Sequence, residues 1–280
     1  MMSDKQLLAL YGLKWNPFNS DIPAEAIWTP PQLGPFSFRL ESLVMDGGFA
    51  MISGEPGLGK SKILHLMAQR LAKLEDVVVG VMERPQSTIN DFYREMSALF
   101  GVNLSPANRY GGFKALRERW HNHIRTTLFR PVLLIDEAQE MTTSVLNEIR
   151  LLSSTNFDSQ SILTTVICGD DRLPERFRTA PLAALGTRIR LRLPLEPLHR
   201  DHLIDYMHHA LEQAGGRHLM TESLVEVLAD HCCGNLRMLN QTAADLLAVA
   251  AEKQIPRIDE GLYLETFSRQ PNTRKQNRKG

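Results

Sequence analysis

The sequence has few cysteines, no excess of charge of either sign and no long hydrophobic run. Its 280 residues include 3 cysteines, and 32 basic and 32 acidic residues give a formal net charge of zero. A neutral chain has no general attraction to nucleic acid, so any DNA-binding surface must be local. No apolar run approaches the ~18 residues of a membrane-spanning helix. Because the first ten residues also lack a basic segment followed by a long apolar core, we expect no signal peptide, no membrane contact and a cytoplasmic location.

The cysteines and histidines do not form the patterns of a disulfide framework or a metal site. Cys168 lies in an apolar segment, and Cys232 and Cys233 are adjacent, which suits neither zinc ligation nor a disulfide between them. All three are therefore expected to be buried, reduced thiols. In the histidine-rich C-terminal part, His199 and His202 are spaced i, i+3 but have no obvious acidic partner, so we expect no metal site there.

One stretch, which we call the phosphate loop, matches a phosphate-binding pattern at every fixed position. The pattern G-x-x-x-x-G-K-[ST] is fitted by Gly54, Glu55, Pro56, Gly57, Leu58, Gly59, Lys60 and Ser61. Glycines let the backbone curl until its N–H groups converge on phosphate oxygens. In such a loop Lys60 places a positive charge at the β- and γ-phosphates of ATP, and Ser61 offers a hydroxyl to Mg²⁺.

The segments on either side of the phosphate loop have the order that the pattern requires. Residues 48–52 are apolar and predict a buried strand, whereas residues 62–72 predict an amphipathic helix. The N-terminus of that helix, which begins with Lys62, adds its own attraction for phosphate. A chance glycine-rich turn is the alternative, and the flanking segments disfavour it.

A second segment, residues 131–137, joins a buried strand to two carboxylates. Its apolar residues predict a strand covered on both faces, and Asp136 and Glu137 follow at the carboxyl end, where ligands of open α/β sheets bind. Asp136 can hold Mg²⁺ through water, and Glu137 can orient and activate an attacking water. The alternative is an exposed acidic pair at a strand end, which the upstream phosphate loop disfavours.

The rest of the chain predicts further strands and helices, and then helices alone. Buried strands are expected over residues 77–82 and 161–168, and an alternating half-exposed strand over residues 188–193. A helix capped by Ser87 or Thr88 and a loop over residues 101–112 follow the first of these strands. The other predicted helices cover residues 39–45, 142–152, 199–214, 221–233, 235–254 and 260–267.

These segments suggest four parts. They are an N-terminal arm (1–47), an α/β nucleotide-binding domain (48–196), an α-helical lid (197–268) and a basic, disordered tail (269–280). The arm is rich in proline and aromatic residues. Trp28 and its neighbours either wall an adenine or pack the arm onto the core, and the second alternative is favoured because aromatic side chains are mostly core material.

Together these residues resemble an AAA+ ATPase of the bacterial group that contains the transposon target-selector ATPases (MuB, TnsC and TniB type) and the ExeA-like secretion ATPases. The resemblance covers roughly residues 5–268. It implies an α/β fold with a parallel five-stranded P-loop sheet between helices, followed by a small all-α lid, and an ATPase that uses ATP and Mg²⁺. The motifs that carry it are Tyr11-Gly12-Leu13 with Asn16-Pro17-Phe18, the phosphate loop, and residues 133–139, 149–153 and 234–240.

The resemblance also assigns roles to residues outside the two motifs. Asp170 takes the place of sensor 1, a position usually held by Asn, Thr or Gln. Arg188 takes the place of an arginine finger that reaches the γ-phosphate of a neighbouring subunit, with Arg190 as the alternative. Arg237 matches sensor 2, and Arg84 occupies a position that can restrain the catalytic glutamate. For each arginine the alternative is a surface charge.

Three functions are consistent with this resemblance. The favoured one is an ATP-dependent regulator of transposition that oligomerises on double-stranded DNA, as a ring or a helical filament, and recruits a transposase. A secretion-system assembly ATPase is expected to carry a membrane span and a periplasmic domain after the lid, which this sequence does not show. A nucleotide switch that binds only protein is the third. For the first function we expect Arg109 and Lys114 to contact DNA phosphates, with the basic tail as the rival element.

Overall fold

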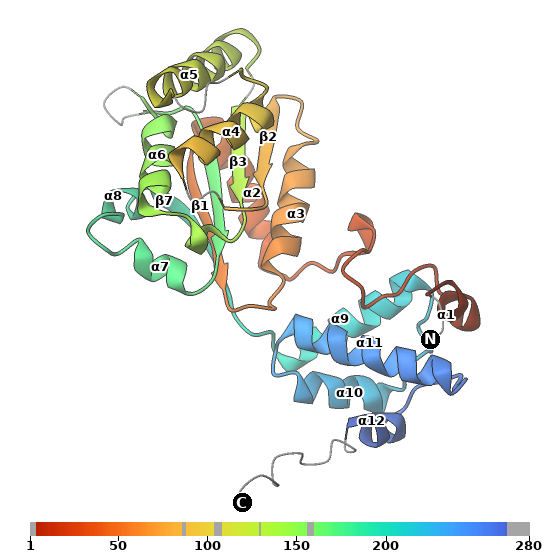
Figure 1. Ribbon diagram of the computed structural model, residues 1–280. Helices are drawn as coiled ribbons and strands as arrows, with labels where there is room; N and C mark the ends of the chain where they lie inside the picture. The colour runs from red at the N-terminus through yellow and green to blue at the C-terminus, as the bar shows by residue number, and fades with distance from the viewer. Residues whose placement is uncertain (1–3, 86–87, 104–107, 129, 156–159, 268–280) are drawn as a thin grey trace, which may run out of the picture. The chain divides into compact units, whose positions relative to one another are not determined.

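The protein folds as two compact units. The computed structural model describes residues 4–85, 88–103, 108–128, 130–155 and 160–267 (Figure 1). One unit, the sheet unit, is Thr29–Glu196, and the other, the helical unit, joins Met1–Trp28 to Pro197–Gly280. The arm predicted over residues 1–47 is thus divided between the two units, and the predicted tail lies outside the described residues.

The sheet unit is built on five parallel strands in the order β2-β3-β6-β1-β7 (Figure 1). This confirms the predicted fold class. β7 lies at an edge and alternates buried and exposed residues, as its sequence predicts, and the edge position lets it hold Pro194. The strands are β1 (Gly48–Gly54), β2 (Val77–Met82), β3 (Arg130–Ile135), β6 (Thr164–Gly169) and β7 (Ile189–Leu195).

Helices cover both faces of this sheet, which is why its central strands β1, β3 and β6 are buried along nearly their whole length. On one face, Phe49 and Leu133 belong to a core shared with α4, α5 and α6. On the other, Ala50 and Leu134 belong to a core shared with α2 and α3. The helices are α2 (Leu33–Asp46), α3 (Lys60–Leu71), α4 (Ile89–Phe100), α5 (Arg109–Thr126), α6 (Thr143–Ser153) and the short α7 (Arg172–Arg176) and α8 (Ala183–Gly186).

Several segments of the sheet unit differ from their sequence-based prediction. The helix expected over residues 39–45 begins earlier, at Leu33, and α7 and α8 are not predicted. The loop expected through Gly112 ends earlier, because the Asn108 side chain accepts a hydrogen bond from Gly111 N (2.9 Å) and caps α5. The strand expected over residues 161–168 is split. Its beginning forms β5 (Gln160–Ser161), which pairs antiparallel with β4 (Ser154–Thr155), and the main sheet takes only β6.

The helical unit packs the N-terminal segment against the C-terminal helices. The Tyr11 hydroxyl donates to the Ile255 carbonyl (2.9 Å), and Trp28 meets Tyr206 edge to face at 5.9 Å between ring centroids. The structure therefore favours packing as the role of the aromatic arm. None of the helices in the described residues is long and apolar enough to cross a membrane. The unit contains α1 (Asp4–Tyr11), the 3-10 turn η1 (Ala24–Ala26), α9 (Arg200–Ala214), α10 (Glu222–His231), α11 (Leu236–Glu252) and α12 (Glu260–Phe267).

A buried carboxylate links three helices of the sheet unit. Glu148 on α6 is 2% exposed and accepts hydrogen bonds from the Tyr93 hydroxyl on α4 (2.6 Å) and from Arg109 Nε on α5 (3.0 Å). Burial, and then the neighbouring carboxylate, raise the pKa of Tyr93, so its hydroxyl keeps its proton and remains a donor. Arg109 supplies the positive charge that a buried carboxylate needs.

We expect Arg109→Ala to lower the free energy of unfolding by about 1–3 kcal/mol, because Glu148 would lose its charged partner while remaining buried. Lys114→Ala on the same helix is the matched control. Its pair with Glu118 is long (3.7 Å) and exposed on both sides, so the change should stay below about 1 kcal/mol. Urea unfolding of both variants measures the difference, and equal stabilities would contradict the role given to Arg109.

Candidate nucleotide-binding site

Three predicted site segments meet at one edge of the sheet. Gly54 ends β1, Asp136 directly follows β3, and Asp170 directly follows β6. These strands are parallel neighbours in the order β3-β6-β1, so their carboxyl ends lie side by side. Buried Cys168 on β6 reports the same proximity, because burial and then Asp136 raise the pKa of its thiol while Lys60 opposes that rise.

The backbone of the phosphate loop adopts conformations that favour glycine. Gly57 and Gly59 have φ values of +93° and +89°, in the left-handed region. A side chain at Gly54 would place its Cβ only 2.5 Å from the Leu195 carbonyl oxygen on β7. Gly59 precedes the first turn of α3 and has no side chain with which to cap it. The loop and the helix N-terminus thus present backbone N–H groups to an anion.

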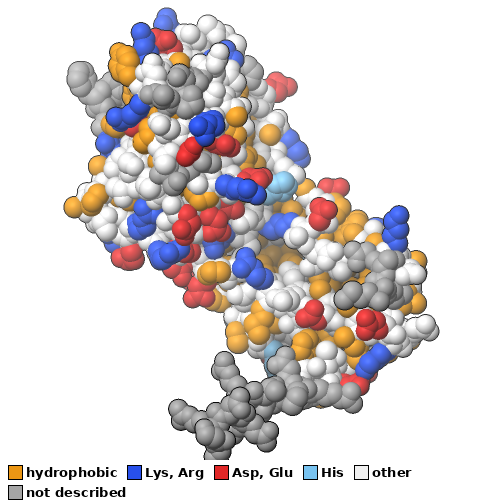
Figure 2. All heavy atoms as spheres, in the orientation of Figure 1, with side chains coloured by type: hydrophobic (Ala, Val, Ile, Leu, Met, Phe, Trp, Pro, Cys, Tyr) orange, Lys and Arg blue, Asp and Glu red, His pale blue; other side chains and the backbone are white. Residues whose placement is uncertain are grey.

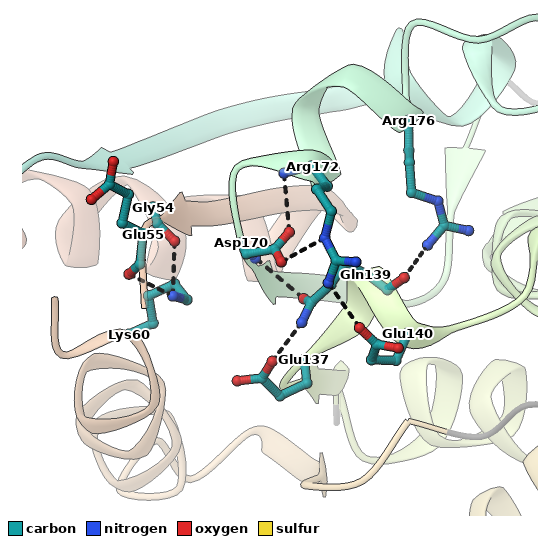
Figure 3. A network of polar contacts seen from close by, with 9 residues as sticks. All are labelled: Gly54, Glu55, Lys60, Glu137, Gln139, Glu140, Asp170, Arg172 and Arg176. Carbon is teal, nitrogen blue, oxygen red and sulfur yellow. Dashed lines mark hydrogen bonds and ion pairs between the residues drawn. The ribbon is translucent and has the colours of Figure 1, made fainter. Parts of the chain in front are cut away.

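Lys60 lies under this loop. Its side chain is nearly buried, at 7% exposure, and Nζ donates to the carbonyl oxygens of Gly54 (2.8 Å) and Glu55 (2.9 Å) (Figure 3). Carbonyl groups orient an ammonium ion but do not neutralise it, so an anionic partner fits beside it. Ser61 is exposed in the first turn of α3 and Lys62 is half-buried there. These residues fit Mg²⁺-bound ATP, with Lys60 for phosphate and Ser61 for the metal.

The carboxylates after β3 are held by a sharp turn. Asp136 N donates to the Met82 carbonyl on β2 (3.0 Å), and Asp136 Oδ1 accepts from Glu137 N (2.9 Å). Glu137 has φ +49°, a left-handed conformation that is uncommon for a residue with a side chain. The turn leaves Asp136 half-buried and Glu137 exposed at the strand end. One carboxylate therefore remains available for a metal and the other for a water.

A polar network, shown in Figure 3, joins this turn to the end of β6. Gln139 in the short turn η2 (Ala138–Glu140) donates through Nε2 to Glu137 Oε2 and accepts through Oε1 from Asp170 N (3.2 Å). Arg172 Nε then donates to Asp170 Oδ2 (2.8 Å), and its Nη2 donates to Glu140 (2.9 Å). The pKa of Arg172 is raised by these partners, Asp170 first. Sequence reasoning missed Gln139 and Arg172, although Gln139 belongs to the 133–139 motif.

The arginine-finger candidates lie at the amino-terminal end of β7, whereas the phosphate loop lies at the carboxyl ends of the strands. Arg188 immediately precedes β7, whose first residue pairs with Phe49 and whose last residue, Leu195, pairs with Gly54. At about 3.3 Å per residue, that strand length separates Arg188 from the phosphate loop of its own chain by roughly 20 Å. Arg190 is exposed two residues further along. An arginine in this position is therefore far from the phosphate loop of its own chain.

The remaining predicted site residues lie on other elements of the two units. Arg84 is exposed just after β2, and Arg237 is exposed in the first turn of α11, in the helical unit. The Asn235 side chain caps that helix by accepting a hydrogen bond from the backbone N–H of Arg237 (3.0 Å). This cap fixes Arg237 in the first turn of α11. Arg109 and Lys114 lie on α5, and Arg109 is engaged with Glu148. Of the three cysteines expected to be buried, Cys168 and Cys232 are buried and Cys233 is exposed.

Comparison with known proteins agrees with this geometry. Residues 44–177 match the AAA domain family. The General secretion pathway protein A of Aeromonas hydrophila is 27% identical over 209 residues, which are 73% of this chain, and the chain spans about 37% of that relative's length.

The fold is also found in solved structures. Cdc6p from Pyrobaculum aerophilum superposes with a TM-score of 0.70 at 15% identity, covering 86% of this chain and 67% of its own. Drosophila ORC bound to DNA superposes with a TM-score of 0.66 at 18% identity, covering 95% and 66%. With its phosphate loop and strand-end carboxylates, this chain contains an AAA-family ATPase domain, which uses ATP and Mg²⁺.

Proposed function

We propose that this ATPase binds double-stranded DNA in its ATP-bound state, oligomerises on it as a ring or helical filament, and regulates transposition by recruiting a transposase. The observation that carries the proposal is that the phosphate loop and Arg188 lie at opposite ends of the parallel strands. This arrangement needs a second copy to complete the site. The motifs that resemble transposon target-selector ATPases, and the likeness to an ORC structure bound to DNA, support DNA as the surface of assembly.

The residues at the strand ends divide the chemistry. Bound ATP and Mg²⁺ supply a phosphoryl group that water can attack. Lys60 would hold the negatively charged phosphates, Ser61 and Asp136 would hold the metal, and the Glu137 carboxylate would orient a water and accept its proton. Arg188 of a neighbouring copy adds positive charge across the subunit contact. Arg237, as sensor 2, would report the nucleotide to the helical unit, and Arg84 would restrain Glu137.

Lys60→Ala should weaken binding of a fluorescent ATP analogue by at least roughly 100-fold, because it removes a charge-assisted contact to phosphate at a nearly buried position. Lys73→Ala, which changes an exposed lysine beyond α3, is the control and should bind normally. Near-normal affinity of the Lys60 variant, with an unchanged melting temperature, would contradict the assignment of the phosphate loop.

Arg188→Ala should leave nucleotide binding by the monomer intact while lowering ATP hydrolysis and assembly together, because the guanidinium acts across a subunit contact. The sharper test mixes Arg188→Ala with Glu137→Gln, each of which is expected to hydrolyse ATP poorly alone. A mixed interface can combine an intact Glu137 from one copy with an intact Arg188 from the other. Recovery of hydrolysis at intermediate ratios supports action in trans. No recovery at any ratio, or loss through Arg190→Ala instead, would contradict the choice of Arg188.

DNA contacts must come from a local surface, because the chain has a formal net charge of zero. On the face visible in Figure 2, basic and acidic side chains are mixed. If Lys114 contacts a phosphate, Lys114→Ala should lower the magnitude of the log–log salt slope by roughly one on any DNA sequence. Arg109→Ala tests the second predicted contact, but only after its stability is measured, because Arg109 also pairs with Glu148. A chain ending at Gln270 tests the tail. If the truncation alone weakens binding, the assignment to α5 is wrong.

A second candidate function, assembly of a secretion system, is favoured by the similarity to General secretion pathway protein A. Electron microscopy of the protein with duplex DNA, Mg²⁺ and a non-hydrolysable ATP analogue separates the candidates. Rings or filaments on DNA, together with ATP-dependent retention of duplex in a filter-binding assay, support the proposed function. Retention of no duplex at low salt would overturn it in favour of the secretion role or a switch that binds only protein.

A further inference from the structure

We propose that Gln139 is a positioning residue for hydrolysis: its side-chain amide orients the Glu137 carboxylate and is itself anchored to the end of β6. This inference rests on the role proposed for Glu137. The amide bridges two site segments, since Nε2 donates to Glu137 Oε2 and Oε1 accepts from Asp170 N (3.2 Å). In Figure 3 the Gln139 amide lies between Glu137 and Asp170.

An exposed carboxylate needs such a partner to hold one direction. Glu137 stands on a left-handed turn at the surface, where a glutamate side chain otherwise samples several rotamers. One hydrogen bond from a fixed donor selects among them. The amide is neutral, so it aligns the carboxylate without the strong charge pairing that an arginine or lysine would impose.

The space occupied by the amide depends on a glycine. A Cβ at Gly169 would lie 2.5 Å from Gln139 Oε1 and 2.9 Å from Leu173 Cδ2. Gly169 is the last residue of β6, and its backbone does not need a glycine for conformational reasons, because its φ is not positive. The missing side chain therefore makes room for Gln139. This observation is independent of the hydrogen bonds and points to the same residue.

Two arginines fix the ends of the bridge. Arg176 donates to the carbonyl oxygens of Gln139 and of Met141 (2.8 Å for the latter), which holds the η2 turn in place. Arg172 binds the Asp170 carboxylate through Nε (2.8 Å). Because that carboxylate is bound by Arg172, Asp170 contacts Gln139 through its backbone N–H, which donates to Gln139 Oε1. The neutral polar group facing Glu137 in this chain is thus the Gln139 amide, and the Asp170 side chain has another partner.

The kinetic test is a double-mutant cycle. Gln139→Leu should lower kcat by roughly 10- to 100-fold, the range expected when a supporting residue lets a catalytic group move, and leave the dissociation constant of a fluorescent ATP analogue unchanged. In a Glu137→Gln background, Gln139→Leu should cause no further loss. Gly169→Ala should reproduce the kcat defect by displacing the amide. Gln69→Leu, which removes an exposed amide bonded to His65 on α3, should have no effect.

A second readout needs neither nucleotide nor turnover. In protein labelled with ¹⁵N-glutamine, the side-chain NH₂ signals of Gln139 are assigned by their loss in Gln139→Leu. Both Glu137→Gln and Gly169→Ala should shift those signals in the nucleotide-free protein, whereas the Gln69 signals should stay in place.

The outcomes separate the two proposals. If Glu137→Gln hydrolyses ATP at a near-normal rate, the role proposed for Glu137 is wrong, and the present inference falls with it. If Glu137→Gln hydrolyses ATP slowly but Gln139→Leu has normal kcat, or lowers kcat by the same factor in both backgrounds, only the inference about Gln139 is overturned. Unmoved Gln139 signals in both Glu137→Gln and Gly169→Ala overturn it as well. A melting temperature equal to that of the parent protein confirms that each variant is folded.

Discussion

The parallel pairing of β3, β6 and β1 is the constraint on which the site depends. Because all three strands run the same way, their carboxyl ends meet at one edge, and the phosphate loop, the Asp136–Glu137 pair and Asp170 are brought together although up to 116 residues separate Gly54 from Asp170. The sheet can keep this pairing because helices bury both of its faces. Polar side chains are then placed at the strand ends, where backbone groups extend beyond the hydrogen-bonded sheet.

The pairing of β7 with β1 means that one copy cannot bring its own Arg188 to its own phosphate loop. β7 runs parallel to β1, so the residue that precedes it lies at the edge opposite the phosphate loop. An arginine there is too far from its own nucleotide to act on it, and the geometry makes cooperation between copies a requirement of the proposed mechanism. Assembly on a polymer such as DNA would provide that cooperation, because it brings identical subunits into a repeated contact.

Charge in this neutral chain is used locally. Arg109 pairs with a buried glutamate and supports the packing of three helices, while Arg172 and Arg176 hold the turn that carries Gln139. These arginines therefore serve internal structure, whether or not any of them also binds an external ligand. This double use is the reason that a DNA contact at Arg109 has to be separated from its contribution to stability.

The sequence by itself determined the main strands of the sheet, most of the helices and the two main motifs. Continuous apolar runs predict strands buried on both faces, and glycines at fixed spacing predict a loop that curls around phosphate, since both signals are local. What only the tertiary structure decided are contacts between distant segments. The Gln139 bridge to β6, the pairing of Arg109 with Glu148 and the split of the strand predicted over residues 161–168 all depend on which segments become neighbours. Residue spacing carries no information about such neighbours, because hydrogen bonds to a distant strand form only after the sheet has brought its ends together.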